Sequence, residues 1–306
     1  MAREPYAAQV ALLVRLLPFI EQEPAFALKG GTAINLFYRD MPRLSVDIDL
    51  TYLPVRDRAD SLTDIDETMN RIMAAATGGI KGLEAQRIAG GGGGATRIRA
   101  RLAGAEVKIE TSPVTRGVVL DPEKRSVSAA VEDEFGFATI QVVSFEDLFG
   151  GKLHAALDRQ HPRDLFDIKL LYENEGLTDA LFRTFLVYVA SSPRPPHELL
   201  APTLSNLDEP FVREFVGMTT ISITVEELAE TRERLLADIR ARMDEKTQKF
   251  LVGLHDGEPD FEAIGLPQAV DLPAVRWKLL NLKKLSAENP EKHSAQKSEL
   301  IEKLFT

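Results

Sequence analysis

Hydrophobic positions in the first half of the chain switch between a helical period and strict alternation. The period of about 3.6 residues predicts helices over residues 5–20, 33–38 and 61–77. Alternation of apolar and polar residues predicts strands over residues 26–28, 44–53, 96–102, 105–111, 118–120 and 138–143. The strands 96–102 and 105–111 flank a turn at Gly104 and form a predicted hairpin with one charged face. Five consecutive glycines, residues 90–94, precede this hairpin and predict a loop or a hairpin tip.

The second half of the chain follows a helical period almost throughout. It predicts helices over residues 144–157, 162–173, 178–190 and 225–252, with a proline-rich connection over 191–210. Pro162 suits the first turn of its helix. The change of pattern predicts an α/β (α+β) core over residues 1–143, with a small mixed or antiparallel sheet, and a mainly helical lobe over residues 144–306.

The amino-acid composition excludes several kinds of catalytic and metal site. The chain has 306 residues and no cysteine, which excludes disulfides, thiolate metal sites and cysteine nucleophiles. Any bound metal is then expected to have oxygen ligands, which favours Mg²⁺ over zinc. Arg15 interrupts the first apolar stretch, so neither a secretory peptide nor a spanning helix is predicted, and a cytoplasmic location without membrane contact is expected.

The net charge of −10 argues against nucleic acid as a partner when it is taken for the whole chain. Its distribution changes that interpretation. Residues 1–118 hold 15 basic and 14 acidic side chains, residues 119–272 hold 15 and 29, and residues 273–306 hold 7 and 4. The acidic excess therefore lies in the middle of the chain, and both ends are neutral to basic.

Two aspartates on one predicted strand are the first candidate for chemistry. Asp47 and Asp49 are two residues apart, so both carboxylates point to one face of a strand. A divalent cation such as Mg²⁺ relieves their repulsion and takes its remaining ligands from phosphates. Gly30 and Gly31 precede a helix that Thr32 can cap, and such a turn offers backbone N–H groups to a triphosphate. The alternative is a surface strand with two solvated aspartates.

Charged residues further along the chain are weaker candidates. Glu110 lies on the polar face of the hairpin and is a third carboxylate, either a general base or a further metal ligand, or else one half of a cross-strand ion pair. Asp164 and Asp167 share a helix face, and with Lys152 they form either a site or a helical hairpin joined by surface ion pairs. Basic side chains that could contact RNA phosphates are Arg97, Arg99 and Arg101 on one strand face, Arg56, Arg58, Arg87 and Arg116 elsewhere in the first lobe, and Lys278, Lys283 and Lys284 near the end of the chain.

Together these residues resemble a known family. The pattern of Gly-Gly, a spaced Asp-x-Asp and a later strand carboxylate is similar to the DNA polymerase β-like nucleotidyltransferase superfamily. Longer segments resemble the AbiEii nucleotidyltransferase toxin family; these are Leu28 to Leu36, Arg43 to Leu50, Lys152 to Ala155, Arg159, Arg163-Asp164, Asp167-Ile168 and Leu272 to Lys278. The resemblance covers roughly residues 25–280.

The resemblance implies a Mg²⁺- or Mn²⁺-dependent nucleotidyltransferase toxin of a bacterial toxin–antitoxin or phage-defence system. Its polymerase β-like core would transfer a nucleotide from a nucleoside triphosphate to RNA, foremost the 3′ end of tRNA, which blocks translation. Asp47 and Asp49 would hold the metal, with Glu110 as the third carboxylate. The triphosphate would contact Gly30, Gly31, Thr32, Lys152 and Arg163, and Lys152 would complete the nucleotide site from the helical lobe. Asp164 and Asp167 match the last motif of the family and would orient Lys152 or Arg163, or position the nucleotide.

Two other functions fit the same residues. One is a transferase that modifies a protein side chain with a nucleotide. The other is a regulatory module that binds a nucleotide without turnover. A cognate antitoxin is an expected partner, and a monomer is expected because no heptad pattern is present.

Overall fold

The computed structural model describes residues 3–88 and 96–305. The glycine run predicted as a loop or hairpin tip, residues 90–94, lies outside the described residues. The chain forms two compact units. The first contains the residues up to Ser144 and the short segment Gly217–Ile221, and the second contains Phe145–Val216 and the residues from Ser222 onward.

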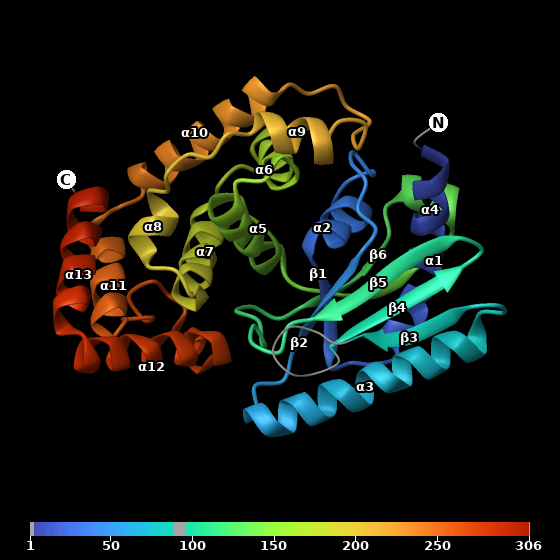
Figure 1. The fold of residues 1–306 in the computed structure, drawn as a ribbon, viewed down its shortest axis with the longest axis horizontal. Coiled ribbons are helices and arrows are strands. Elements are labelled where there is room, and N and C mark those ends of the chain that lie inside the picture. The colour runs from blue at the N-terminus through green and yellow to red at the C-terminus, as the bar shows by residue number, and fades with distance from the viewer. Residues whose placement is uncertain (1–2, 89–95, 306) are drawn as a thin grey trace. The chain divides into compact units, whose positions relative to one another are not determined.

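The first unit is built on a mixed sheet (Figure 1). Its strands are β1 Phe26–Lys29, β2 Ile48–Tyr52, β3 Glu84–Ile88, β4 Arg97–Leu102, β5 Ala105–Thr111, β6 Glu123–Ser126 and β7 Thr139–Val142. The seven strands lie in the order β3-β4-β5-β2-β1-β7-β6. The pairs β2–β5 and β1–β7 are parallel, and the other neighbours are antiparallel. The predicted α/β class with a small mixed sheet is confirmed.

Helices pack on this sheet. They are α1 Arg3–Glu21, α2 Gly30–Ala33, the π-helical turn η1 Ile34–Tyr38, α3 Arg58–Gly79 and α4 Ala129–Phe135. Helix α1 contacts β5 and β7, and α3 contacts β3 and β4. The apolar positions that predicted the first helix, Val10, Leu13 and Leu17, are fully buried, as expected for a helix that covers a sheet.

The predicted strand over residues 44–53 is wrong in its first half, because β2 begins only at Ile48. The chain before it pairs instead with the returning segment Gly217–Ile221. The backbone N–H of Leu44 donates to the carbonyl of Met218 at 2.8 Å, and Arg43 forms a bridge with Thr219. Alternation alone could not reveal a partner more than 170 residues away in the chain.

Other corrections concern short elements of this unit. Residues 118–120 form no strand in the described structure, and β3, β6 and α4 were not predicted. Strand β6 has the sequence Glu-Lys-Arg-Ser and no apolar position, so its pattern carries no alternation signal. The predicted helix at residues 33–38 begins earlier, at Gly30, and continues as η1.

The second unit is helical (Figure 1). Its helices are α5 Phe145–Arg159, α6 Pro162–Asn174, α7 Asp179–Ser191, α8 Pro196–Leu200, α9 Asp208–Glu214, α10 Val225–Ala241, α11 Glu245–Asp256, the 3₁₀ turn η2 Pro267–Asp271, α12 Pro273–Glu288 and α13 Pro290–Phe305. Helix α5 packs on α6 and α7, and α12 packs on α7 and α13. No helix in the described part of the chain is sufficiently long and apolar to span a membrane.

Helix ends in this unit follow local rules. Pro162 occupies the first turn of α6 as predicted, and the ring of His161 caps that helix by accepting from the backbone N–H of Arg163. The single predicted helix over residues 225–252 is two helices. The side chain of Asp244 starts the second helix because it accepts from the backbone N–H of Thr247 at 2.8 Å.

Candidate active site

The turn between β1 and α2 has glycine at both of its first positions, and at Gly30 the backbone conformation itself favours glycine. Gly30 has φ +77°, and a Cβ atom there would lie 2.5 Å from Oδ2 of Asp49. A Cβ on Gly31 would lie 2.6 Å from Nη2 of Arg43 and 2.9 Å from Oγ of Ser45. Any larger residue would therefore displace either an aspartate or an arginine. The two glycines bring the backbone of this turn against one carboxylate and one guanidinium group.

Hydrogen bonds tie the segment before β2 to this turn. The hydroxyl of Thr32 donates to the backbone carbonyl of Asp47 at 2.5 Å and lies 3.1 Å from Oγ of Ser45. The backbone N–H of Arg43 donates to Oδ1 of Asn35 at 3.3 Å. Thr32 and Arg43 are both buried, so these contacts are shielded from water. Thr32 thus fixes the position of Asp47 through its main chain.

Four charged residues form a row across neighbouring strands. Register pairs join Lys29 on β1 to Asp49 on β2, Asp49 to Glu110 on β5, and Glu110 to Arg97 on β4. Side chains at paired positions point to the same face of a sheet. Nε of Arg97 lies 2.5 Å from Oε2 of Glu110, and desolvation lowers the pKa of Lys29 while Asp49 opposes that change. We call these four residues the charge row.

The charge row places two carboxylates side by side with a cation at each end. Asp47 lies before β2 and is exposed, so it is outside the strand on which it was predicted. Among the described residues, no group of three or more acidic or histidine side chains is arranged to hold a metal ion. Mg²⁺ is commonly bound by one or two carboxylates together with substrate phosphates. Asp49 and Glu110, with Asp47 nearby in sequence, fit that kind of shared site.

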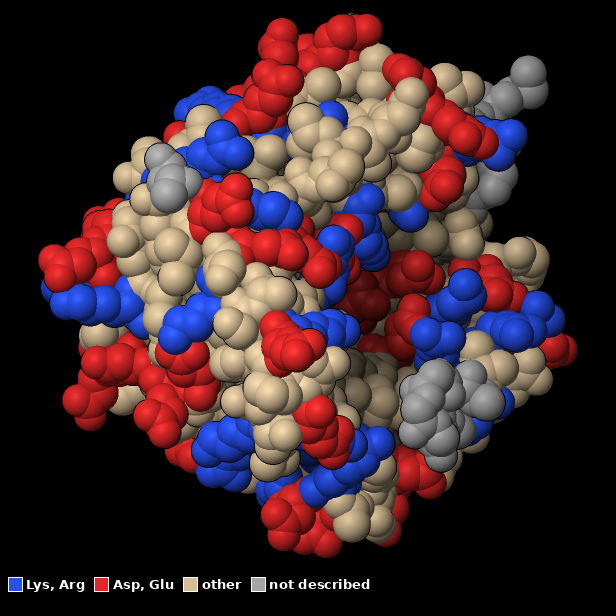
Figure 2. Space-filling view, turned by 60° about the vertical axis from the view of Figure 1, so that its left-hand side comes forward, with Lys and Arg blue, Asp and Glu red and all other residues tan. Residues whose placement is uncertain are grey.

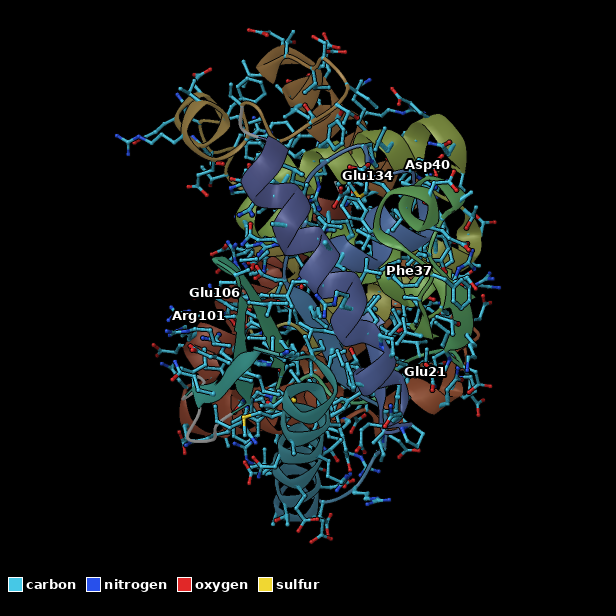
Figure 3. The ribbon with its side chains drawn as sticks, turned by 90° about the vertical axis from the view of Figure 1, so that its right-hand side faces the viewer. Glu21, Phe37, Asp40, Arg101, Glu106 and Glu134 are labelled. Carbon is cyan, nitrogen blue, oxygen red and sulfur yellow. The ribbon has the colours of Figure 1, made fainter. Side chains whose placement is uncertain are left out.

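The three arginines of β4 lie on one face, as the alternation predicted. All are partly exposed, and each contacts a glutamate of β5. Nε of Arg101 lies 2.7 Å from Oε2 of Glu106, and Arg99 reaches the same carboxylate at 3.9 Å. Figure 3 shows Arg101 and Glu106 together on this hairpin. Their predicted role in binding RNA stays a prediction, with the guanidinium groups already positioned by carboxylates.

The second unit contains a buried cluster of charges. Nζ of Lys152 on α5 lies 2.8 Å from Oδ1 of Asp164 and 3.1 Å from Oδ2 of Asp167, both on α6. Nη2 of Arg159 binds the other oxygen of Asp164 at 2.8 Å. The side chains of Lys152, Asp164 and Asp167 are 8, 4 and 0% exposed. We call these four residues the Lys152 cluster.

The Lys152 cluster brings together three of the residues predicted in this unit and leaves out a fourth. Arg163 lies on α6 but its side chain is 44% exposed, and Nη2 is 3.9 Å from Glu214. Asp164 contacts Lys152 and Arg159. The roles predicted for Lys152 and Arg163 in binding phosphate, and for Asp164 and Asp167 in positioning, stay predictions.

The structure adds residues to the site to which the sequence analysis gave no role. Lys29 immediately precedes the two glycines, and its partner became visible only through the strand register. Arg43 and Ser45 lie beside Gly31, and Arg159 completes the Lys152 cluster. The segments that carry the family resemblance include all four, but their contacts depend on tertiary structure.

The chain matches the model of a known protein family. The model of the family described as nucleotidyl transferase AbiEii toxin, type IV TA system, matches residues 11–280. This range includes the Gly-Gly turn, the charge row and the Lys152 cluster. Comparison with curated protein sequences gives no significant match.

Comparison with solved structures supports the fold. The chain is similar to MenT4, a nucleotidyltransferase toxin from Mycobacterium tuberculosis H37Rv, with a TM-score of 0.62 and 17% sequence identity. The similarity covers 90% of this chain and 93% of MenT4. At this identity the similarity establishes a shared fold.

Proposed function

Since the chain belongs to the AbiEii nucleotidyltransferase toxin family of type IV toxin–antitoxin systems, we propose that it transfers a nucleoside monophosphate from a triphosphate to the 3′ end of tRNA. Such a transfer blocks aminoacylation and therefore translation. Family membership makes the protein a nucleotidyltransferase toxin. The choice of tRNA as the acceptor and of Mg²⁺ as the metal is our proposal.

The pairing of Asp49 with Glu110 beside Gly30 is the observation that carries this proposal. Two adjacent carboxylates supply oxygen ligands for a hard cation. The close approach of Asp49 to Gly30 puts those oxygens next to the turn that would bind the triphosphate. In this proposal Asp47, Asp49 and Glu110 hold the metal, and Gly30, Gly31 and Thr32 contact the phosphates.

The reaction is an in-line displacement at the α-phosphorus. The 3′ oxygen of the acceptor forms a bond to that phosphorus, the bond to the β-phosphate oxygen breaks, and pyrophosphate leaves. The hydroxyl proton passes to a carboxylate of the charge row, for which Glu110 is the candidate. A bound Mg²⁺ supplies charge neutralisation for the attacking and leaving oxygens. The protein contributes mainly by fixing the geometry of the two substrates.

A labelled-nucleotide assay tests the proposal directly. Purified protein is incubated with Mg²⁺, total tRNA and each of the four α-labelled nucleoside triphosphates in turn. We expect label in tRNA with the wild-type protein and a loss of at least about 100-fold in Asp49→Asn, which keeps the shape of the side chain but removes its charge. Undiminished labelling by Asp49→Asn would show that the metal site is assigned to the wrong carboxylate.

The same assay separates the two alternative functions. Addition of a cell extract in place of tRNA detects transfer to protein, and label found only in protein bands would replace the RNA acceptor. Calorimetry detects triphosphate binding without turnover. Binding without transfer to any acceptor would identify a regulatory module.

We also propose a cognate antitoxin as the partner and a monomer as the state of the free protein. The family name implies an antitoxin. Light scattering of the purified chain tests the monomer, and co-expression with the product of the neighbouring gene tests whether toxicity is suppressed.

A further inference from the structure

Helix α12 presents its largest apolar side chains to solvent. Trp277 is the only tryptophan of the chain and is 61% exposed, and Leu280, three residues later on the same side of the helix, is 62% exposed. The inward side is formed by Ala274, Val275, Lys278 and Leu282, which are buried. Tryptophan is enriched at binding interfaces, because its large apolar ring and its polar N–H suit a surface that is covered by a ligand.

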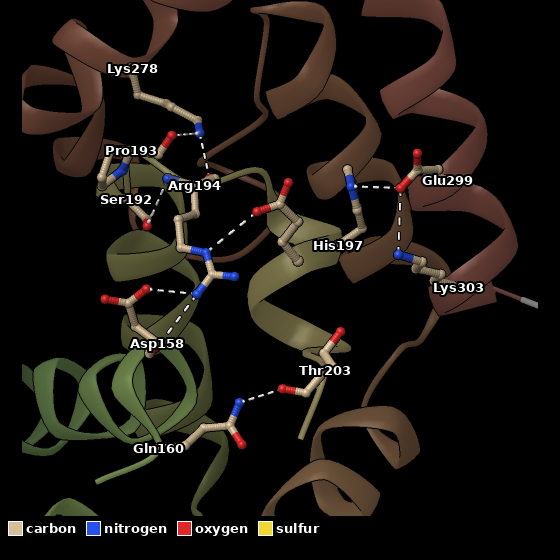
Figure 4. Close-up of polar contacts among 11 residues, drawn as sticks. Asp158, Gln160, Ser192, Pro193, Arg194, His197, Thr203, Lys278, Glu299 and Lys303 are labelled. Carbon is tan, nitrogen blue, oxygen red and sulfur yellow. Dashed lines mark hydrogen bonds and ion pairs between the residues drawn. The ribbon is translucent and has the colours of Figure 1, made fainter. Parts of the chain in front are cut away.

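The rotation of α12 is fixed by its buried side. Lys278 points inward, and its Nζ donates to the backbone carbonyl of Arg194 at 2.6 Å and to that of Pro193 at 3.4 Å (Figure 4). Lys278 is therefore not available to the RNA phosphates for which it was predicted. Because successive residues of a helix are about 100° apart, the inward direction of Lys278 keeps the neighbouring indole on the outside.

The exposed side of α12 is also basic. Because Lys278 points inward, the helix has three exposed basic residues and one exposed acidic residue, whereas residues 119–272 hold 15 basic and 29 acidic ones. Exposed cations beside the indole are Arg276, Lys283 and Lys284. Arg276 pairs with Asp271, and Lys284 is only 3.9 Å from Glu288. Figure 2 shows small groups of basic side chains among acidic ones on the face that it draws, rather than one broad basic field. Residues 276–284 thus form a local basic segment that contains the exposed indole of Trp277.

We propose that the side of α12 formed by Arg276, Trp277, Leu280, Lys283 and Lys284, the Trp277 face, binds a single-stranded segment of the RNA acceptor. A base stacks on the indole of Trp277, and the lysines contact the flanking phosphates. Aromatic side chains interleaved with cations are the usual way in which proteins bind single strands without reading their sequence. The identity of the ligand as RNA depends on the proposed function.

The size, packing and charge of the Trp277 face favour RNA over a protein partner or a membrane surface. A protein interface of standard size buries about 800 Å² on each partner, and α12 offers only two large exposed apolar side chains within the described structure. A helix that lies in a membrane surface needs a continuous apolar side, but on α12 that side is packed against α7 and α13. A polyanion with flat bases matches both the indole and the cations.

The single tryptophan gives a direct test, because its emission reports on this face alone. The intact protein is titrated with a twelve-nucleotide oligoadenylate and, separately, with inorganic polyphosphate of similar charge. We expect the RNA to quench Trp277 emission with saturation and polyphosphate to leave the emission unchanged, because it has no bases to stack. An oligodeoxyadenylate shows whether the face prefers RNA. Unchanged emission at RNA concentrations that saturate binding would overturn the proposal.

Variants measured with dye-labelled RNA complete the test. Trp277→Leu is expected to weaken binding about tenfold, the size of the loss of one stacked base. The double variant Lys283→Gln/Lys284→Gln is expected to lower the slope of log K against log salt concentration by about 1.4. Phe137→Leu is the matched control, because Phe137 is also aromatic and 61% exposed but lies in the first unit. Equal affinities of Trp277→Leu and wild type would overturn the proposal.

The outcomes also separate this proposal from the proposed function. Trp277→Leu could transfer nucleotide to tRNA as well as the wild type, and Trp277 emission could stay unchanged when RNA binds. These two results together would overturn the proposal for the Trp277 face and leave the proposed transferase function standing. Saturable quenching by RNA without transfer to any acceptor would support RNA binding at the Trp277 face and overturn the proposed transfer to RNA. Quenching by a purified antitoxin but not by RNA would assign the face to a protein partner and overturn the proposal.

Discussion

The charge row in the sheet and the Lys152 cluster in the helical unit have the same formal composition but different environments. Each contains two carboxylates and two cations. The charge row is open at the end formed by Glu110 and Arg97, whose side chains are 27% and 45% exposed, whereas burial at the other end lowers the pKa of Lys29. The Lys152 cluster is closed, and only the side chain of Arg159 reaches solvent substantially, at 61%.

The difference in exposure suits the two sets of charges to different roles. A carboxylate that water can reach exchanges its partner at little cost, because solvent replaces the lost interaction. A buried carboxylate that loses its lysine keeps a charge that water cannot solvate, and its remaining partners compensate only part of that charge. The charge row is thus suited to binding a ligand that arrives and leaves, whereas the Lys152 cluster is suited to holding α5 and α6 in one arrangement.

The largest expected effect is a loss of stability on Lys152→Met. The variant leaves Asp164 and Asp167 buried without the ammonium group that binds both. We expect the free energy of unfolding at pH 7 to fall by about 3–5 kcal/mol, the range for breaking a buried ion pair from one side. Urea denaturation measures the change.

Lys169→Met is the control for this prediction. Lys169 lies on the same helix as the two aspartates and binds Glu173 at 2.5 Å, but the glutamate is half exposed. We expect the control to change the free energy of unfolding by less than about 1 kcal/mol. A wild-type denaturation curve for Lys152→Met, together with lost transfer activity, would instead make the Lys152 cluster an open functional site like the charge row.

The second prediction concerns activity rather than stability. Glu110→Gln is expected to lower nucleotide transfer at least about 100-fold, with little change in the denaturation midpoint, because Glu110 is partly exposed. Glu106→Gln is a closely matched control. Glu106 lies on the same strand, faces the same way, is 32% exposed and binds Arg101 at 2.7 Å (Figure 3), but it is not paired with Asp49. Equal losses in both variants would remove Glu110 from the metal site.

The outcome at β2 shows what a sequence pattern can and cannot predict. The segments 26–28 and 105–111 were predicted closely, because alternation of buried and exposed positions is a local property. The pairing of Asp49 with Lys29 and Glu110 was not predictable from alternation, because register is set by tertiary packing. Asp47 was assigned to the strand, but β2 begins at Ile48, and the backbone N–H of Leu44 binds the carbonyl of Met218 instead.

The helical unit illustrates the same limit. Helices α5, α6 and α7 lie close to their predicted ranges, with Pro162 at the start of α6. In contrast, α8 lies within the segment predicted as a connection, and α9, α12 and α13 were not predicted. The spacing of Asp164 and Asp167 predicted a shared face and correctly placed them together. Both aspartates are buried against Lys152, and Asp164 also binds Arg159; these contacts follow from the packing of α5 on α6, which no local signal contains.

The third prediction extends the comparison to a buried lysine without a carboxylate partner. Burial lowers the pKa of Lys278 to about 8, and Glu198 opposes this change. In the unfolded chain the lysine keeps its ordinary pKa near 10.5, so between pH 8 and 10.5 the unfolded state binds more protons. Stability therefore rises with pH in this window, by about 2 kcal/mol between pH 8 and 10 from this residue alone.

Comparison with Lys278→Met isolates this contribution, because other groups titrate equally in both proteins. Urea denaturation at pH 8, 9 and 10 should show the difference in the free energy of unfolding between the two proteins shifting in favour of the wild type as pH rises. A constant difference would mean that the carbonyls of Pro193 and Arg194 hold the ammonium group at its ordinary pKa despite burial.

The smallest expected effect is that of Arg97→Gln at the open end of the charge row. Because the side chain is 45% exposed, removal of its ion pair with Glu110 should change the free energy of unfolding by less than about 1 kcal/mol. If Arg97 also contacts RNA phosphate, KM for the acceptor rises while kcat stays near the wild-type value. Denaturation and steady-state transfer measured on the same preparation distinguish these effects. Destabilisation as large as that of Lys152→Met would show that the row is held together as a structural unit. The charge row would then be as rigid as the Lys152 cluster. The proposed difference between the two would be wrong at Arg97, where the exposed side chain makes it easiest to test.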